Sequence, residues 1–326
     1  MTPSAEPPPD SAPAPEAAPA VSAPAEAPPR RPIAARLLSD RAAIGYLLIL
    51  VATILFSANN NLAKEAYRHG VSVDTVLVGR SWFLVPLLCL WFAARRTWPA
   101  VPRGMAGWLV LGAILFSVNG WSLLSAFDRM SVSLAILVFY LFPFMVGLLA
   151  AALRIEPLRP AMAIGLVVAF AGLYLALDTE GELHPMGVVL ALVSALAISG
   201  NILVSGKLMR HGMSPVAVAF WMVLGSSILY GGTLAASGGF HWPNSTTGWA
   251  AFAGTIVFIC AAFVMFYGAL NFLREARTAL VMNLEPIFTI VMAVALFGEA
   301  FGGTQWLGAA LVVLAIFGVA LAGRKG

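Results

Sequence analysis

The chain has 326 residues, of which 60% are hydrophobic and only 10% are charged. Soluble domains carry roughly 25% charged residues, so this composition indicates a polytopic membrane protein and excludes the soluble fold classes. The net charge of +4 comes from basic residues dispersed among short loops, which argues against a nucleic-acid-binding surface.

Residues 1–40 differ in composition from the rest of the chain. Up to about residue 32 the sequence is nearly all Pro, Ala, Ser and Glu, and it holds 11 of the 21 prolines. Such a segment cannot bury a core, so we expect a disordered cytoplasmic tail. It lacks the basic start and apolar centre of a signal peptide.

From residue 42 onward, apolar stretches follow one another, each close to the roughly 20 residues that one membrane-spanning helix needs. We predict an all-α polytopic membrane protein with ten transmembrane helices and short loops. The helices are placed at 42–63, 74–94, 105–126, 131–152, 160–178, 186–206, 215–237, 248–270, 277–297 and 304–323.

Lysine and arginine are distributed unevenly between alternate loops. With a cytoplasmic N-terminus, 15 of the 19 basic residues fall on the cytoplasmic side, and only Lys64, Arg68, Arg80 and Arg129 lie at or near the outer side. Cytoplasmic loops are enriched in these residues, so both termini are predicted to be cytoplasmic. The alternation also supports an even number of helices.

The chain contains an internal repeat of about 143 residues. The stretch Leu280–Glu299 has a weaker copy at Leu137–Glu156, in which Pro143 corresponds to Pro286 and Glu156 to Glu299. At an offset of 142, Arg68-His69-Gly70 recurs as Arg210-His211-Gly212, and Asn59 corresponds to Asn201. The repeat divides the membrane part into a first unit at 42–182 and a second unit at 183–326, each with five predicted helices.

Five is an odd number, so the second unit is expected to be inverted in the membrane relative to the first. Inverted repeats underlie alternating access in many secondary transporters, which bind substrate near the midplane at the interface between the repeats. The repeat therefore favours a transporter. A non-transporting membrane scaffold or sensor with the same fold is the alternative, and a membrane enzyme is disfavoured because no cluster of His, Asp and Glu is present.

Glu285 is the only acidic residue deep inside an apolar stretch, about eight residues or roughly 12 Å into its predicted helix. A carboxylate in hydrocarbon is costly and is a functional-site hypothesis by default. It could be a protonatable or ammonium-binding group that lines the cavity, or a structural hydrogen-bond partner of a neighbouring helix. Pro286 frees the carbonyl near Met282 and is expected to kink the helix there.

Polar residues at membrane depth supply the other cavity candidates. Asn283 corresponds to Tyr140 in the repeat, and the two are predicted to line the cavity. Of the run Asn59-Asn60-Asn61, at most two side chains can face inward, and Asn59 is favoured because of its counterpart Asn201. The competing explanation is that these asparagines form hydrogen bonds between helices and do not line a cavity. The same ambiguity holds for two residues of the third predicted helix, Asn119 and Trp121.

Three further groups complete the candidate set. Arg80 could bind a substrate carboxylate, but it could instead extend to the membrane interface or pair with Asp74. Trp221 and Tyr267 lie deep enough to stack on an aromatic substrate. Pro143, Pro286, Glu156 and Glu299 are predicted to have structural or gating roles. Neither cysteine, Cys89 or Cys260, belongs to a metal-binding pattern, so no metal or other cofactor is expected.

The segments LEPIFTIVMAVALFGE and QWLGAALVVLAIFGVAL, with the first-half copy RIEPLRPAMAIGLVVAFAGLYLAL, resemble the EamA-type family of the drug/metabolite transporter superfamily. The resemblance covers about 42–323. It implies secondary transport of a small metabolite across the cytoplasmic membrane, with an amino acid or related amphipathic solute as cargo and export favoured. Its expected partners are that solute, the bilayer and protons. The chain has no phosphate-binding GxxxxGK[ST] loop, which fits transport without ATP.

Overall fold

Helices make up most of the described part of the chain. The computed structural model describes residues 41–155, 160–177, 184–269, 271–273, 278, 281–298 and 302–322, and it contains no strand within those ranges. The predicted tail, 1–40, lies outside the described residues. In chain order the helices are α2 (Arg41–Arg68), α3 (Val73–Ala94), α4 (Ala106–Arg129), α5 (Val132–Phe139), α6 (Phe142–Ala152), α7 (Pro160–Leu177), α8 (Pro185–Arg210), α9 (Pro215–Ala236), α10 (Thr246–Ala269), α12 (Glu285–Phe297) and α13 (Gly303–Ala322).

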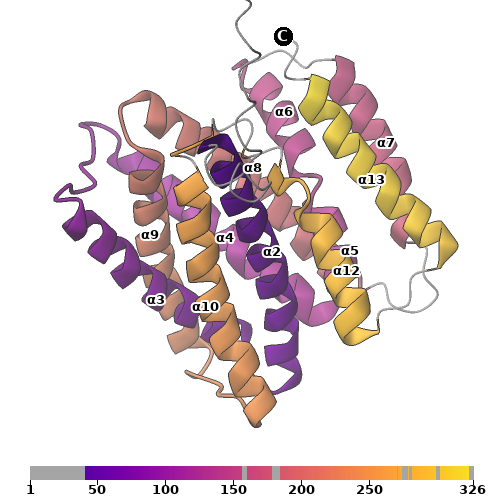
Figure 1. The fold of residues 1–326 in the computed structure, drawn as a ribbon, viewed down its shortest axis with the longest axis horizontal. Helices are drawn as coiled ribbons and strands as arrows, with labels where there is room; N and C mark the ends of the chain where they lie inside the picture. The colour runs from indigo at the N-terminus through magenta and orange to yellow at the C-terminus, as the bar shows by residue number, and fades with distance from the viewer. Residues whose placement is uncertain are drawn as a thin grey trace, which may run out of the picture.

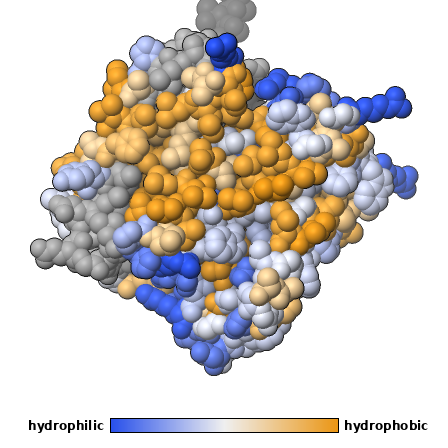
Figure 2. Space-filling view, turned by 180° about the vertical axis from the view of Figure 1, so that it is seen from behind, coloured by the Kyte–Doolittle hydropathy of each residue, from blue (hydrophilic) through white to orange (hydrophobic). Residues whose placement is uncertain are grey.

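Seven helical segments in the described ranges are long and apolar enough to cross a bilayer, with α5 and α6 together counting as one. Shorter apolar helices, Ala163–Gly172, Glu285–Phe297 and Gly303–Gly318, lie where the fifth, ninth and tenth spans are predicted. The protein is therefore an all-helical, multi-pass membrane protein. Figure 2 shows apolar residues over the middle of one face, with hydrophilic residues gathered toward its margins.

Helix ends differ from the prediction where polar residues continue the helix beyond the apolar stretch. Both α2 and α8 extend to the arginine of the repeated Arg-His-Gly triplet. Gly70 and Gly212 then adopt positive φ angles of 84° and 94°, a conformation that glycine adopts without strain at helix C-termini. Ser72 and Ser214 next cap α3 and α9, each accepting a backbone N–H bond of 3.2 Å.

Two predicted helices are broken in the structure. The stretch 131–152, expected as one helix, is split into α5 and α6 by a turn at Tyr140 and Leu141. In the second half, α12 begins only at Glu285, after a turn at Asn283 and Leu284. Each break comes just before a proline, Pro143 or Pro286, that occupies the first turn of the new helix. Proline has no N–H for the preceding turn and is well tolerated at a helix start, which explains both breaks.

The helices pack in pairs that cross the midpoint of the sequence (Figure 1). α2 packs along α10 and α4 along α8, α7 lies beside α13, and α3 beside α9. If the helices of the second half are matched in order to those of the first, the pair α2–α10 corresponds to the pair α8–α4. The pairs α7–α13 and α3–α9 then correspond to themselves. This set of pairs is therefore unchanged when the two halves are exchanged.

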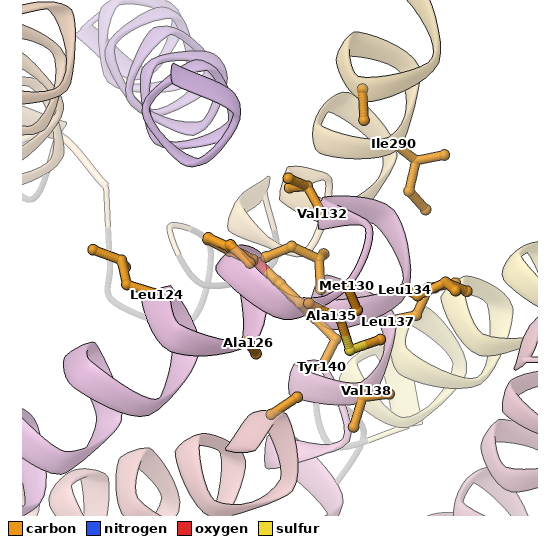
Figure 3. Close-up of a cluster of buried hydrophobic side chains, with 14 of the residues drawn as sticks. Leu124, Ala126, Met130, Val132, Leu134, Ala135, Leu137, Val138, Tyr140 and Ile290 are labelled. Atoms are coloured by element: carbon orange, nitrogen blue, oxygen red, sulfur yellow. The ribbon is translucent and has the colours of Figure 1, made fainter. Parts of the chain in front are cut away.

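α5 lies at the centre of the largest hydrophobic cluster (Figure 3). Every residue from Val132 to Val138 is buried, and the helix packs against α4, α7, α8 and α12. A helix that is apolar on all sides is stable only when it is surrounded by others. Its last turn carries Tyr140, whose side chain is only 3% exposed, into the interior beside α12.

The close approach of α7 and α13 depends on Gly172. A Cβ atom there would lie 2.7 Å from the Gly308 carbonyl oxygen and 2.9 Å from the Val312 nitrogen, both backbone atoms that cannot move aside. We expect Gly172→Ala to lower the free energy of unfolding by about 1–3 kcal/mol, through overpacking. A thermal melt of the purified protein measures this. Gly318→Ala on α13, where a Cβ meets nothing within 4 Å, is the control and should leave the melting temperature unchanged.

Candidate functional site

The site is built around the break that precedes α12. Because Pro286 has no N–H, the carbonyl of Met282 is not used by the helix that follows. The Tyr140 hydroxyl lies 3.3 Å from that carbonyl oxygen. Glu285 occupies the first turn of α12, where the exposed N–H groups and the helix dipole favour a negative charge. The break thus explains why a carboxylate is tolerated at this depth.

Both oxygens of the Glu285 carboxylate are hydrogen-bonded to neutral side chains. Oε1 accepts a bond of 3.0 Å from the Asn60 amide on α2, and Oε2 accepts one of 3.0 Å from the Tyr140 hydroxyl at the end of α5. The ion pairs in the described ranges lie elsewhere, near the ends of α2 and α4. Among the described residues, the carboxylate is therefore stabilised without a cation, which leaves it able to take a proton or a cationic ligand.

The position of Tyr140 suits both protonation states of Glu285. When the carboxylate is ionised, the Tyr140 hydroxyl donates to Oε2. When Oε2 carries a proton, it can donate to the Tyr140 oxygen, and the hydroxyl hydrogen can turn to the Met282 carbonyl. Glu285 and Tyr140 each keep a hydrogen-bond partner in both states, and leaving a buried polar group without one costs about 1–3 kcal/mol. The site can thus gain or lose a proton without moving its heavy atoms.

A hydrogen bond at the site occurs twice in the molecule. The Ser57 hydroxyl on α2 donates to the Glu285 carbonyl at 3.1 Å, and the Ser199 hydroxyl on α8 donates to the Phe142 carbonyl at 3.0 Å. Ser57 and Ser199 are 142 residues apart, and Phe142 and Glu285 are 143 apart. These are the two offsets of the sequence repeat. The first helix of each half is therefore bonded to the broken helix of the other half at an equivalent place.

The asparagine run in α2 meets the site through Asn60 and Asn61. Asn60 reaches Glu285, while the Asn61 amide donates to the carbonyls of Ser57 and Thr289 at 3.0 and 3.3 Å. The repeat favoured Asn59 as the inward residue, but Asn59 points to another side of the helix. Its buried Oδ1 has no hydrogen-bond partner in the described part of the chain. A role for Asn59 in the cavity stays a prediction.

Asn119 and Asn201 tie α4 to α8. The Asn119 amide donates to the Ser194 hydroxyl at 2.8 Å, and that hydroxyl donates back to the Asn119 carbonyl at 3.0 Å. The Asn201 amide donates to the Gly112 carbonyl at 2.9 Å. This geometry matches the competing explanation for these asparagines, namely that their side-chain amides form hydrogen bonds between helices. Neither residue contacts Glu285.

The other predicted residues are spread over the molecule. Trp121 is 38% exposed and lies at the surface, and the Trp221 indole donates to the Pro99 carbonyl at 3.0 Å. Asn283 is half-buried in the turn before Glu285, and Pro143 lies in the first turn of α6. The side chain of Tyr267, and both Glu156 and Glu299, lie outside the described residues.

Arg80 lies on α3 and does not form the predicted pair with Asp74. The Nε and Nη2 atoms of Arg80 and the Oδ1 atom of Asp74 are buried, and none has a partner in the described part of the chain. The two residues are six positions apart, which points their side chains about 120° apart around a helix with 100° per residue. The pairing fails for that reason.

Two residues that make the hydrogen bonds at the site escaped the sequence analysis. Ser57 and Ser199 are small hydroxyl residues of a kind common inside membrane helices, and only the repeat offset sets them apart.

Lys64, on α2, contacts the carbonyls of Phe127 and Met130 at the end of α4, the latter at 3.1 Å. Within the described ranges no three His, Cys, Asp or Glu side chains are grouped closely enough to hold a metal ion.

Asn60 and Asn59 provide a matched test of the site. Asn60→Ala removes the donor to Oε1 of Glu285, and a hydrogen bond to a charged group contributes about 1.5–3 kcal/mol. The transport hypothesis of the sequence analysis therefore predicts that solute exchange falls roughly tenfold or more. Asn59→Ala changes the same side chain one residue away and should retain most of the exchange. Counterflow in proteoliposomes measures both variants. Equal effects of the two substitutions would contradict the assignment of Asn60 to the site.

The fold and the site define an all-helical, multi-pass membrane protein with one embedded carboxylate at a helix break. The model of the EamA-like transporter family matches residues 43–177 and 185–321, and the chain belongs to this family.

Curated relatives are similar over most of their length. The chain is 28% identical over 295 residues to "Uncharacterized transporter YcbK" of Bacillus subtilis (strain 168), covering 85% of this chain and 93% of the relative. It is 27% identical over 259 residues to an "Uncharacterized transporter" of Archaeoglobus fulgidus, covering 78% and 92%. A solved crystal structure of a protein shares the fold with a TM-score of 0.59 at 19% identity, over 86% of this chain and 98% of that one.

Proposed function

We propose that this transporter is a secondary carrier of a small organic metabolite that works by alternating access between two inverted five-helix units. The proposal comprises ten spans, cytoplasmic termini and a place in the cytoplasmic membrane. The cargo we propose is an amino acid or related amphipathic solute, with export as the favoured direction. The protein acts without catalysis of its own, which fits its membership of a transporter family.

The observation that carries this proposal is the junction around Glu285. The carboxylate, on the second half, is held by Asn60 and Tyr140, which both belong to the first half. A substrate or proton that binds Glu285 therefore acts on the contact between the halves. In inverted-repeat transporters this contact is the one that changes when the halves rock against each other.

The recurrence of contacts at the repeat offset supports the two-unit part of the proposal. Ser57 and Ser199 make the same backbone contact at equivalent positions, and both halves have a broken helix with a proline after the turn. The helix pairs described above are also unchanged on exchange of the halves. Two similar units packed in this way can adopt two conformations that are related by exchanging the roles of the units.

A scaffold or sensor with the same fold is the alternative. Such a protein has no need for an embedded carboxylate without a fixed cation, because a structural carboxylate is more stable when paired or replaced by an apolar residue. Glu285 therefore favours transport.

Counterflow in proteoliposomes tests the proposal. Vesicles are loaded with unlabelled amino acids, nucleosides or cationic drugs, and uptake of trace labelled solute is followed. Transport predicts transient accumulation of at least one solute class above protein-free vesicles. If the folded protein exchanges none of the three classes, the scaffold alternative is favoured.

A further inference from the structure

Lys64 on α2 is bound to the backbone of another membrane helix. Its ammonium group donates to the carbonyl oxygens of Phe127 and Met130, the latter at 3.1 Å, and lies 3.5 Å from that of Asp128. These carbonyls belong to the C-terminal end of α4, where the last carbonyls of a helix have no helical partner and carry a partial negative charge. Lys64 therefore caps α4 from a neighbouring helix.

The bond joins two of the helix pairs described above, α2–α10 and α4–α8. At the same end, the His69 ring of α2 is hydrogen-bonded at 2.8 Å to Ser245, just before α10 begins. Met130, which follows α4, lies against the start of α8, where a Cβ atom on Gly187 would be 2.8 Å from its sulfur atom. Four helix termini therefore meet at this end of the molecule, the Lys64 end, and Lys64 connects one pair to the other.

The opposite end has no lysine in the equivalent place. At the repeat offset of 142, which relates the Arg-His-Gly triplets of α2 and α8, Lys64 corresponds to Gly206. The next residue, Lys207, points about 100° away around α8. Its ammonium group lies over the Trp108 ring of α4, 3.6 Å from the ring centroid. Because α4 and α8 form one pair, Lys207 stays within its own pair, whereas Lys64 crosses between pairs.

We propose that Lys64 is a one-sided latch, which holds the pair α2–α10 against the pair α4–α8 at the Lys64 end and favours the conformation closed there. Opening that end separates a charged donor from the carbonyls that it caps, and Gly206 has no side chain to give the opposite conformation an equal bond. In the orientation proposed above, the Lys64 end is the outer one, so the resting protein opens to the cytoplasm. The inference rests on the proposed transport function and adds which of the two conformations is preferred.

Distances between spin labels on the full-length protein in proteoliposomes test the latch without any ligand. Both native cysteines are replaced by Ala, and double electron–electron resonance is measured for two label pairs. Met186→Cys with Thr247→Cys labels exposed residues at the starts of α8 and α10 and reports on the Lys64 end. Leu47→Cys with Ala106→Cys labels exposed residues near the starts of α2 and α4 and reports on the opposite end.

In the labelled protein with Lys64 intact, we expect short distances to dominate at the Lys64 end. Lys64→Met should lower the ratio of closed to open populations there about tenfold or more, and distances at the opposite end should shorten as those at the Lys64 end lengthen. Unchanged distances at both ends of folded Lys64→Met would overturn the proposal. Lengthening at both ends would also overturn it, because that result indicates a loosened fold and not a shift between two conformations.

Further lysine variants serve as controls. Lys64→Arg keeps a cationic donor and should retain most of the closed population. Lys207→Met removes the lysine that stays within its own pair and should leave the Lys64 end closed. Opening of the Lys64 end by Lys207→Met to the same extent as by Lys64→Met would contradict the latch. Lys64→Gln keeps an uncharged donor and should give a smaller shift in the same direction, and it replaces Lys64→Met if a thermal melt shows that Lys64→Met does not fold.

Counterflow separates this inference from the proposed function. A population shift in Lys64→Met, together with no exchange of any solute by the wild type, would remove the transport proposal and leave the latch. Exchange by the wild type, with label distances that do not respond to Lys64→Met, would do the reverse.

Discussion

Glu285→Gln is expected to abolish solute accumulation driven by a pH gradient while leaving counterflow within about threefold of the wild type, a change of under 1 kcal/mol. Glutamine has the same shape as a protonated glutamate. Its oxygen can accept from Asn60, and its amide can donate to the Tyr140 oxygen, with the Tyr140 hydroxyl turning to the Met282 carbonyl. The substitution therefore preserves the packing and removes only the ability to exchange a proton.

Proteoliposomes that hold equal amounts of folded protein allow both activities of Glu285→Gln to be measured side by side. Loss of both pH-driven accumulation and counterflow would show that the carboxylate binds the solute itself. Retention of both would show that Glu285 is a structural partner of α2 and α5. Either result would contradict a role of Glu285 in proton coupling. The first would assign it to solute binding, and the second to a structural role.

Tyr140→Phe is expected to lower counterflow roughly tenfold or more. The change removes one oxygen atom, which leaves Oε2 of Glu285 without its donor and the Met282 carbonyl without a nearby hydroxyl. A hydrogen bond to a charged group contributes about 1.5–3 kcal/mol, and the buried ring itself is unchanged. The initial rate of exchange and the melting temperature, measured on the same preparation, separate loss of function from loss of fold.

The control for Tyr140→Phe is Tyr174→Phe on α7, because the Tyr174 side chain is 75% exposed on the outer surface of the helix bundle. The control should behave as wild type in both measurements. Wild-type exchange in folded Tyr140→Phe would mean that Glu285 does not need this donor. The account of Tyr140 as the hydrogen-bond partner of Glu285 in both protonation states would then be wrong.

The positions of the membrane helices could be predicted largely from hydropathy, because apolar stretches near 20 residues long have few alternatives in a bilayer. The helix ends could not. α2 and α8 continue into polar sequence as far as the Arg-His-Gly triplets, since a helix needs no hydrocarbon around it to persist. The break between α5 and α6 was missed because the stretch is uniformly apolar, and hydropathy does not register that Pro143 lacks an N–H.

The site could be predicted only in part. Glu285 was identifiable as the single embedded acidic residue, and Pro286 indicated the free carbonyl near Met282. The choice among three adjacent asparagines could not be made, since it depends on the rotation of α2 against α12, which the sequence leaves open. Asn60 was identified as the residue at the site only from its hydrogen bond to Glu285 in the structure.

Repeat symmetry was a useful but incomplete guide. Contacts do recur at the repeat offset, as Ser57 and Ser199 show, because equivalent backbones meet in equivalent ways, but the sequence analysis did not single out these two residues. It did not predict where the halves differ. Phe142 and Glu285 occupy equivalent positions, yet only Glu285 takes part in the polar network with Asn60 and Tyr140.

The central claim is that the position beside Glu285 becomes accessible from both sides of the membrane in turn. It is tested by Asn283→Cys in a background in which Cys89 and Cys260 are replaced by Ala, with membrane-impermeant thiol reagents applied to either side of sealed vesicles of known orientation. Alternating access predicts labelling from both sides, with both rates reduced by a solute that is active in counterflow. Labelling from one side only, whatever solute or pH is imposed, would contradict it.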